Sequence, residues 1–184
     1  EGKPKPVALG IVRNASPVLL DPQNLIYQVH DGAVKAVDAV YDRGAALIDS
    51  GTDVSGYSAL VSQSVAAGEF ATALDSGLIK LGGSPDGQIT ADVQGDADPT
   101  YESTIDPIIL RILTKHAGLP TDVINRGSFA GLVATGGDIG WYIGVDERPT
   151  SAQVIDALVS GVAGFWGTDR IGRIRAGRLR KPEA

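Results

Sequence analysis

The most regular hydrophobic pattern of the chain lies near its C-terminal end, over residues 148–179. Apolar side chains recur there at three- and four-residue steps: Val154, Ile155, Leu158, Val159 and Val162. This spacing predicts an amphipathic helix with one buried face. Thr150 or Ser151, next to Pro149, can cap its first turn.

A different pattern follows this helix. Arg173 and Arg175 alternate with Ile174 and Ala176, which is typical of a half-buried strand. The segment 167–172 begins and ends with glycine and contains an aspartate, so it predicts a tight turn. We therefore expect a helix followed by a β-hairpin, with Phe165 and Trp166 as apolar anchors.

The first hundred residues alternate between short apolar runs and turn signals. Strands are expected over 7–12, 18–20, 25–29, 33–41, 45–48, 69–74, 78–81 and 88–93. One short helix is expected over 57–66, where Leu60, Val61 and Val65 share a face. This half predicts a small β-rich sheet or partial barrel.

The polar, acidic segment 95–100 predicts a boundary, after which helical patterns prevail. Asp106 and Pro107 are expected to begin a helix that ends at Gly118, and a second helix is expected over 122–134, ended by Gly136 and Gly137. A strand over 139–145 leads into the terminal helix. The predicted fold is α+β, with a β-rich subdomain over 1–98 and a subdomain over 99–184 that contains helix, helix, strand, helix and hairpin.

Composition narrows the classes of function. The chain has 184 residues, 43% of them hydrophobic, and a formal net charge of −6, which argues against broad affinity for nucleic acid although basic residues gather near the C-terminus: Arg170, Arg173, Arg175, Arg178, Arg180 and Lys181. No apolar run approaches the roughly 20 residues that span a bilayer. The absence of methionine suggests a fragment of a longer polypeptide.

Motifs of catalysis, cofactor binding and metal binding are missing from the sequence. His30 and His116 stand apart, and the acidic group Asp92, Asp96, Asp98 and Glu102 lacks the register of a calcium loop. We therefore expect no catalytic, cofactor or metal site. For a glycosidase, Asp42, Asp53 or Glu102 could serve as carboxylates, but sequence alone defines no separation between them. A less favoured alternative is a cell-wall hydrolase domain, which would need a cleft with two carboxylates or a His-centred triad.

The sequence contains residues typical of interaction surfaces, in contrast to the missing catalytic motifs. Arg173, Arg175 and Arg178 on the expected terminal strand, together with Trp141 and Tyr142, form the candidate interaction surface. The aromatic residues leave a second class of function open, a carbohydrate-binding or host-recognition module in which Trp141, Tyr142, Trp166 and Tyr101 stack against a sugar.

Two stretches of the second half resemble the hub or baseplate hub proteins of tailed bacteriophages and the related spike proteins of type VI secretion. They are TIDPIILRILTKHAGLP and PTSAQVIDALVSGVAGFWGTDRIGRIRAG. The first half, with KPVALGIVRNASPVLLDPQNLIYQVHDG and VYDRGAAL, looks like the central region of large phage tail proteins. The matching residues are packing and turn positions, so the resemblance transfers no catalytic residue.

The resemblance implies a structural protein of the virion tail, made in the bacterial cytoplasm. Its partners would be other copies of itself, as a trimeric ring in the parent protein, and other tail proteins that join the tail tube to the spike or fibre apparatus. DNA would be passing cargo at most. A negative channel wall would let DNA slide without sticking, which predicts that Asp92, Asp96 and Asp98 face a lumen.

Overall fold

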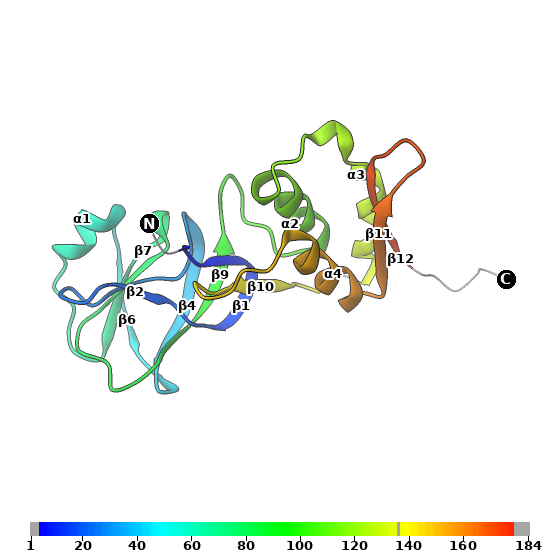
Figure 1. Ribbon diagram of the computed structural model, residues 1–184. Coiled ribbons are helices and arrows are strands. Elements are labelled where there is room, and N and C mark those ends of the chain that lie inside the picture. The colour runs from blue at the N-terminus through cyan, green and yellow to red at the C-terminus, as the bar shows by residue number, and fades with distance from the viewer. Residues whose placement is uncertain (1–3, 136, 179–184) are drawn as a thin grey trace. The chain divides into compact units, whose positions relative to one another are not determined.

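The computed structural model describes residues 4–135 and 137–178. The chain has an α+β fold that ends in a β-hairpin and divides into two compact units (Figure 1). The first unit contains Glu1–Glu102 and Gly140–Arg148, and the second contains Ser103–Ile139 and Pro149–Ala184. None of the helices in the described ranges has the length and apolar character needed to cross a bilayer.

Two five-stranded sheets make up the first unit. One has the strand order β10-β1-β9-β4-β5 and is antiparallel throughout. The other has the order β2-β3-β8-β7-β6 and is antiparallel except for its parallel β6–β7 pair. The strands are β1 (Val7–Ala15), β2 (Val18–Asp21), β3 (Ile26–Gln28), β4 (Val34–Asp42), β5 (Ala45–Ala46), β6 (Ile48–Asp53), β7 (Glu69–Ala73), β8 (Leu78–Leu81), β9 (Ile89–Asp96) and β10 (Gly140–Ile143).

The two sheets share one hydrophobic core. Its buried residues come from both of them: Val12 and Ala15 of β1, Val34 and Val40 of β4, Val93 of β9, Phe70 of β7 and Ile79 of β8. A second cluster, around Ile26, Leu60 and Ala71, packs the short helix α1 (Gly56–Val61) against the second sheet. The first unit is thus a small β structure with one helix on it.

Strand β4 contains three valines at helical spacing, and a bulge accounts for the spacing of the last two. Val34, Val37 and Val40 are three residues apart, yet all three belong to or pack against the core. The register against β9 is regular from Val34 to Val37, so these two side chains lie on opposite faces of the strand. It shifts between Val37 and Ala39, and such a bulge inserts one residue, which brings Val37 and Val40 to the same face. The expected hairpin into β5 is present, with Leu47 N–H donating to the Val40 carbonyl.

Two predictions about the first unit need correction. The segment 48–53 was not expected as a strand beyond residue 48, yet it forms β6 at the edge of the second sheet. The strand expected over 139–145 does not belong with the second half, because β10 pairs with β1 and lies in the first unit. The first unit therefore includes a strand that lies beyond the predicted boundary between residues 98 and 99.

The second unit is built from short helices. Helix α2 (Ile105–Arg111) continues into a π-helical turn (Ile112–His116) and buries Ile105, Ile108 and Ile109. Thr104 rather than Asp106 occupies the N-cap position. Asp106 lies in the first turn, where its negative charge interacts favourably with the helix dipole. Gly118 adopts a left-handed φ of +67°, and Leu119 N–H then donates to the Leu113 carbonyl.

The helix expected over 122–134 is interrupted. It consists of a 3₁₀ turn (Thr121–Val123), helix α3 (Arg126–Phe129) and a second 3₁₀ segment (Ala130–Thr135). Asn125 leaves the helical conformation, with ψ at 78°, and its N–H donates to the Ile174 carbonyl. A bond to the terminal hairpin thus replaces a helical one. Gly136, expected to end this helix, lies outside the described residues.

The last helix agrees with the prediction except at Val162, which was expected on its buried face but is the half-buried C-cap residue after the helix. Helix α4 (Ser151–Gly161) begins after Thr150, whose hydroxyl accepts the Gln153 N–H while the Gln153 side chain accepts the Thr150 N–H. This reciprocal capping box satisfies two N–H groups of the first turn. The helix buries Val154, Ile155, Leu158 and Val159, and the chain then enters β11 (Gly164–Thr168) and β12 (Ile174–Arg178).

Candidate interaction surface

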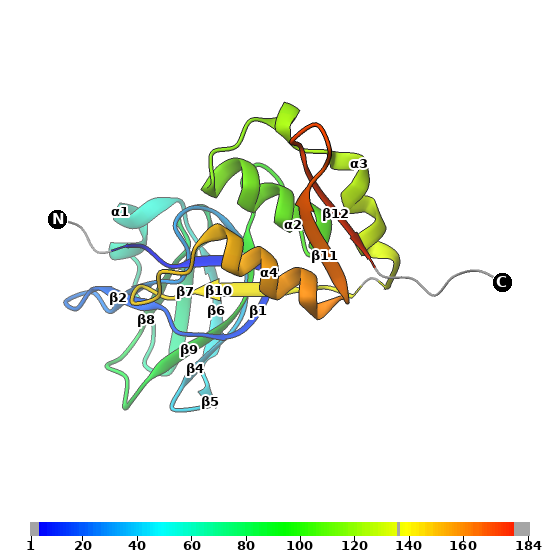
Figure 2. The same ribbon diagram turned by 45° about the vertical axis from the view of Figure 1, so that its right-hand side comes forward.

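Figure 2 shows strands β11 and β12 joined as a hairpin. Asp169 organises the turn between them. Its carboxylate accepts the N–H groups of Ile171 and Arg173 at 3.0 and 2.9 Å and pairs with the Arg173 guanidinium at 3.1 Å. The Arg173 N–H, together with these other donors, lowers the pKa of Asp169. The turn therefore holds Arg170 and Ile171 at a fixed, exposed tip, where Ile171 is 73% exposed.

One face of the hairpin is basic and aromatic. The register places Phe165 opposite Gly177 and Gly167 opposite Arg175, so these side chains share a face. Phe165 is 43% exposed, and the Arg175 guanidinium lies 5.8 Å from the centroid of its ring. A Cβ on Gly177 would lie 2.8 Å from Cζ of Phe165, so this ring lies directly over the glycine. Phe165 is therefore a surface residue, not the apolar anchor expected from the sequence.

The opposite face holds the hairpin to its own unit. Ala176 is buried, Trp166 is half-buried across from it, and the Trp166 indole N–H donates to the Asp156 carboxylate of α4. The Ala176 N–H donates to the Ser128 hydroxyl at 3.0 Å. Arg178 follows the alternation of Ile174 and Ala176 and lies on this inner face, half-buried. Of the three arginines singled out in the sequence, Arg173 and Arg175 share the outer face, and Arg178 does not.

Trp141 and Tyr142 lie apart from these arginines, on β10 in the first unit. They are neighbours on a strand, so their side chains point to opposite faces. Tyr142 packs against the core, and its hydroxyl donates to the Ser16 carbonyl at 2.8 Å. Burial raises the pKa of Tyr142, and the negative charge of Glu147 raises it further. The indole nitrogen of Trp141 is buried and has no hydrogen-bond partner among the described residues. The two rings do not form one stacking surface.

The first unit carries a groove of about 480 Å³ between the β4–β5 turn and the segments 67–69 and 81–86. Its lining includes the apolar residues Leu47, Leu81 and Pro85 and three carboxylates: Asp42, Glu69 and Asp86. The Asp42 carboxylate accepts the N–H groups of Asp86 and Gly87 at 2.7 and 2.9 Å, which fixes the 83–87 loop. We call this feature the acidic groove.

Other carboxylates singled out in the sequence have structural partners. Asp53 accepts the Thr72 hydroxyl and the Leu74 N–H, both at 3.0 Å. Asp92 binds the Arg13 guanidinium at 3.1 Å and the Asn14 N–H at 2.9 Å. Asp96 is fully buried. The expectation that Asp92, Asp96 and Asp98 line a lumen is therefore wrong for Asp96, whose side chain is buried, and stays a prediction for Asp92 and Asp98.

The two histidines have different environments. His30 is 1% exposed, and its Nδ1 accepts the Ala8 N–H at 3.0 Å, while Nε2 lies 3.7 Å from the Asp96 carboxylate. His116 is exposed at the end of the π-helical turn. In the described part of the chain, no three His, Asp or Glu side chains gather as a metal ion would require.

Charge separates between the units more sharply than the sequence pattern indicated. The first unit holds 16 Asp and Glu against 7 Lys and Arg, and the second holds 6 against 9. Their formal net charges are −9 and +3. Arg180 and Lys181 of the second unit lie outside the described residues, but Arg170, Arg173, Arg175 and Arg178 all belong to the hairpin. Counting charged residues separately on each side of the unit boundaries would have revealed this difference in net charge from the sequence.

Comparison with known proteins finds no match: no family model, no curated protein and no solved structure matches the chain.

Proposed function

We propose that this chain is a structural part of a bacteriophage tail tip, a hub-like protein that works by holding copies of itself and other tail proteins together. The observation that carries this proposal is the outer face of the hairpin. Phe165 and Arg175 on its strands are exposed to solvent, and so are Arg170 and Ile171 on its turn. Hydrogen bonds to Asp169 fix this turn. Aromatic residues and arginine are enriched in protein interfaces, and a pre-ordered loop loses little conformational entropy on binding.

Charge separation supports the same proposal. A chain with one acidic and one basic unit can attract other copies locally although its net charge is −6. Contacts between two different patches are heterologous, and a heterologous contact that closes produces a ring. This is the kind of assembly that the resemblance to phage hub proteins implies.

The carbohydrate-binding alternative has less support. Tyr142 packs against the core of the first unit and donates its hydroxyl to the Ser16 carbonyl, and Trp141 points to the other face of the same strand. A hydrolase is likewise less supported, because Asp42 and Asp53, two of the carboxylates considered for it, bind backbone N–H groups of neighbouring loops.

Antibody labelling of phage particles tests the proposal. An antibody raised against the purified chain should label one end of the tail in electron micrographs of particles that encode it. The same preparation should leave peptidoglycan intact. Absence of the chain from purified particles, or release of sugar from peptidoglycan by the chain, would contradict the proposal.

A further inference from the structure

We infer that the β11–β12 hairpin of one copy docks into the acidic groove of a second copy. This inference rests on the proposed function and names the contact that would join neighbouring copies. The occupant of the groove is a second copy of the same chain, because both complementary surfaces occur on it.

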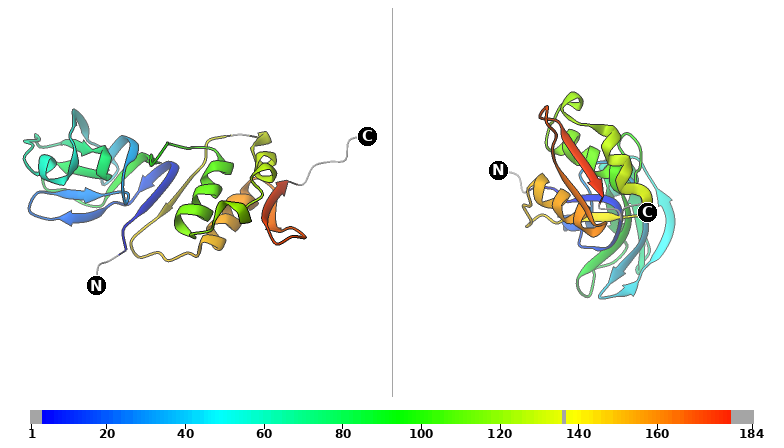
Figure 3. Two further views of the ribbon diagram at one scale, coloured as in Figure 1. Left: turned by 90° about the horizontal axis from the view of Figure 1, so that it is seen from above. Right: turned by 90° about the vertical axis from the view of Figure 1, so that its right-hand side faces the viewer.

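The hairpin offers an exposed basic surface at Arg170 and Arg175, which form no ion pair within the described residues. Asp169, the aspartate of its turn, pairs with Arg173 and leaves the charges of Arg170 and Arg175 to solvent. Arg170 and Arg175 are exposed. The hairpin is the last described element of the second unit, and Figure 3 shows it in orange and red.

The groove offers the opposite charge in a concave setting. It holds three carboxylates against one cation, Arg43, whose aliphatic stem packs on Gly87, where a Cβ would lie 2.1 Å from Arg43 Cγ. Its volume of about 480 Å³ falls within the range typical of sites that enclose a ligand, roughly 300–1,000 Å³. The carboxylates of Glu69 and Asp86 make no hydrogen bond or ion pair within the described residues, so they are available to a guanidinium.

Exposed apolar side chains accompany the charges on both sides. Ile171 and Phe165 are 73% and 43% exposed on the hairpin. Beside the groove, Ile48 is 66% exposed and lies opposite Glu69 in the β6–β7 ladder. A phosphate backbone would use the arginines but would leave these apolar side chains in water. The combination therefore favours a protein surface over a nucleic acid as the partner.

Charge reversal tests the contact on the full chain. The hairpin variant carries Arg170→Glu and Arg175→Glu, and the groove variant carries Glu69→Lys and Asp86→Lys. Sedimentation velocity should show that either variant alone self-associates about tenfold or more weakly than the wild type, because attraction becomes repulsion. An equimolar mixture of the two variants should regain association, since each then offers the complement of the other.

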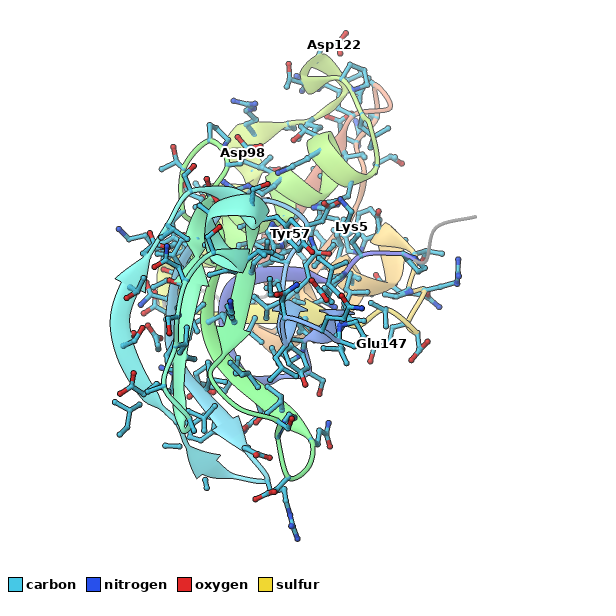
Figure 4. All side chains as sticks on the ribbon, turned by 90° about the vertical axis from the view of Figure 1, so that its left-hand side faces the viewer. Lys5, Tyr57, Asp98, Asp122 and Glu147 are labelled. Carbon is cyan, nitrogen blue, oxygen red and sulfur yellow. The ribbon has the colours of Figure 1, made fainter. Side chains whose placement is uncertain are left out.

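Matched controls separate the contact from net charge. Lys35→Glu with Arg148→Glu changes the charge as the hairpin variant does, and Asp122→Lys with Asp146→Lys changes it as the groove variant does. All four side chains are exposed, and Asp122 is labelled in Figure 4. These controls should associate within about twofold of the wild type, since they leave both surfaces intact. Circular dichroism confirms that each variant is folded.

Three results would overturn the inference. One is association that neither reversal weakens. Another is a mixture that stays monomeric although both variants are folded. The last is loss of duplex DNA binding in the hairpin variant with no change in self-association, which would assign the hairpin to nucleic acid. If tail-tip labelling succeeds while the mixture stays monomeric, the proposed function stands and this contact fails.

Discussion

The Arg175 guanidinium lies 5.8 Å from the centroid of the Phe165 ring, so a cation of β12 covers an aromatic side chain of β11 on the outer face of the hairpin. This separation is within the range of a cation–π interaction. The pair keeps an apolar ring on the surface partly covered while it leaves the positive charge in solvent.

A double-mutant cycle measures this pair. Arg175→Met and Phe165→Leu should show a coupling of about 0.5–1 kcal/mol in the free energy of unfolding, as expected for an exposed cation–π pair. Urea unfolding followed through Trp166 fluorescence, in a Trp141→Phe background, reports the second unit. Additive effects of the two substitutions would show that the side chains do not interact in solution.

The capping box of α4 predicts a second effect on stability. Thr150→Ala should lower the free energy of unfolding by about 1 kcal/mol, because the Gln153 N–H loses its acceptor and the first turn of the helix frays. Thr150→Ser keeps the hydroxyl and should stay close to the wild type. Equal unfolding midpoints for the alanine and serine variants would mean that the cap contributes nothing.

The buried histidine predicts a larger effect. His30→Leu should destabilise the first unit by about 1–3 kcal/mol, because the Ala8 N–H would remain buried without its acceptor at Nδ1. His116→Leu is the matched control, since His116 is exposed, and it should change stability by less than about 0.5 kcal/mol. Thermal unfolding followed by circular dichroism compares the two. Similar losses in both variants would refute the assigned role of His30.

Asp21 provides a prediction about pH. The hydroxyl of Tyr57, the residue labelled in Figure 4, donates to the Asp21 carboxylate. This bond, with those from Asn24 and neighbouring N–H groups, lowers the pKa of Asp21 from 3.8 to about 2. The stabilisation from this carboxylate is therefore fully present above pH 3.8 and is lost as the pH falls toward 2. Carbon-detected NMR titration should find the pKa of Asp21 closer to 3.8 in Tyr57→Phe. The pKa of Asp169, in the other unit, should not change. An Asp21 titration that the substitution leaves unchanged would contradict the assigned hydrogen bond.

Much of the fold could be predicted because the alternation of apolar residues and the helix-capping residues favour the same elements that the tertiary contacts stabilise. The alternation around Ile174 and Ala176 and the cap at Thr150 specify their elements without help from distant residues. Strand β6 lacks such a signal: its sequence IDSGTD is mostly polar, and pairing with β7 makes it a strand. The place of β10 could not be predicted either, because its partner β1 lies some 130 residues earlier in the chain.

The candidate surface was predictable only in part. The residue types of Arg173, Arg175, Trp141 and Tyr142 indicate binding, but register and long-range pairing decide which of them share a face. Phe165 and Ile171 were missed as surface residues because apolar character alone predicts burial. The acidic groove was missed because its carboxylates come from three separate segments.

The mass of the wild-type chain in solution tests the central claim, that copies join through oppositely charged surfaces, most directly. Sedimentation velocity should show a mass that rises with protein concentration at low ionic strength and falls back toward a single chain in high salt, because screening weakens contacts between exposed charges. A mass that stays at one chain under both conditions, or an assembly that high salt leaves unchanged, would contradict the account.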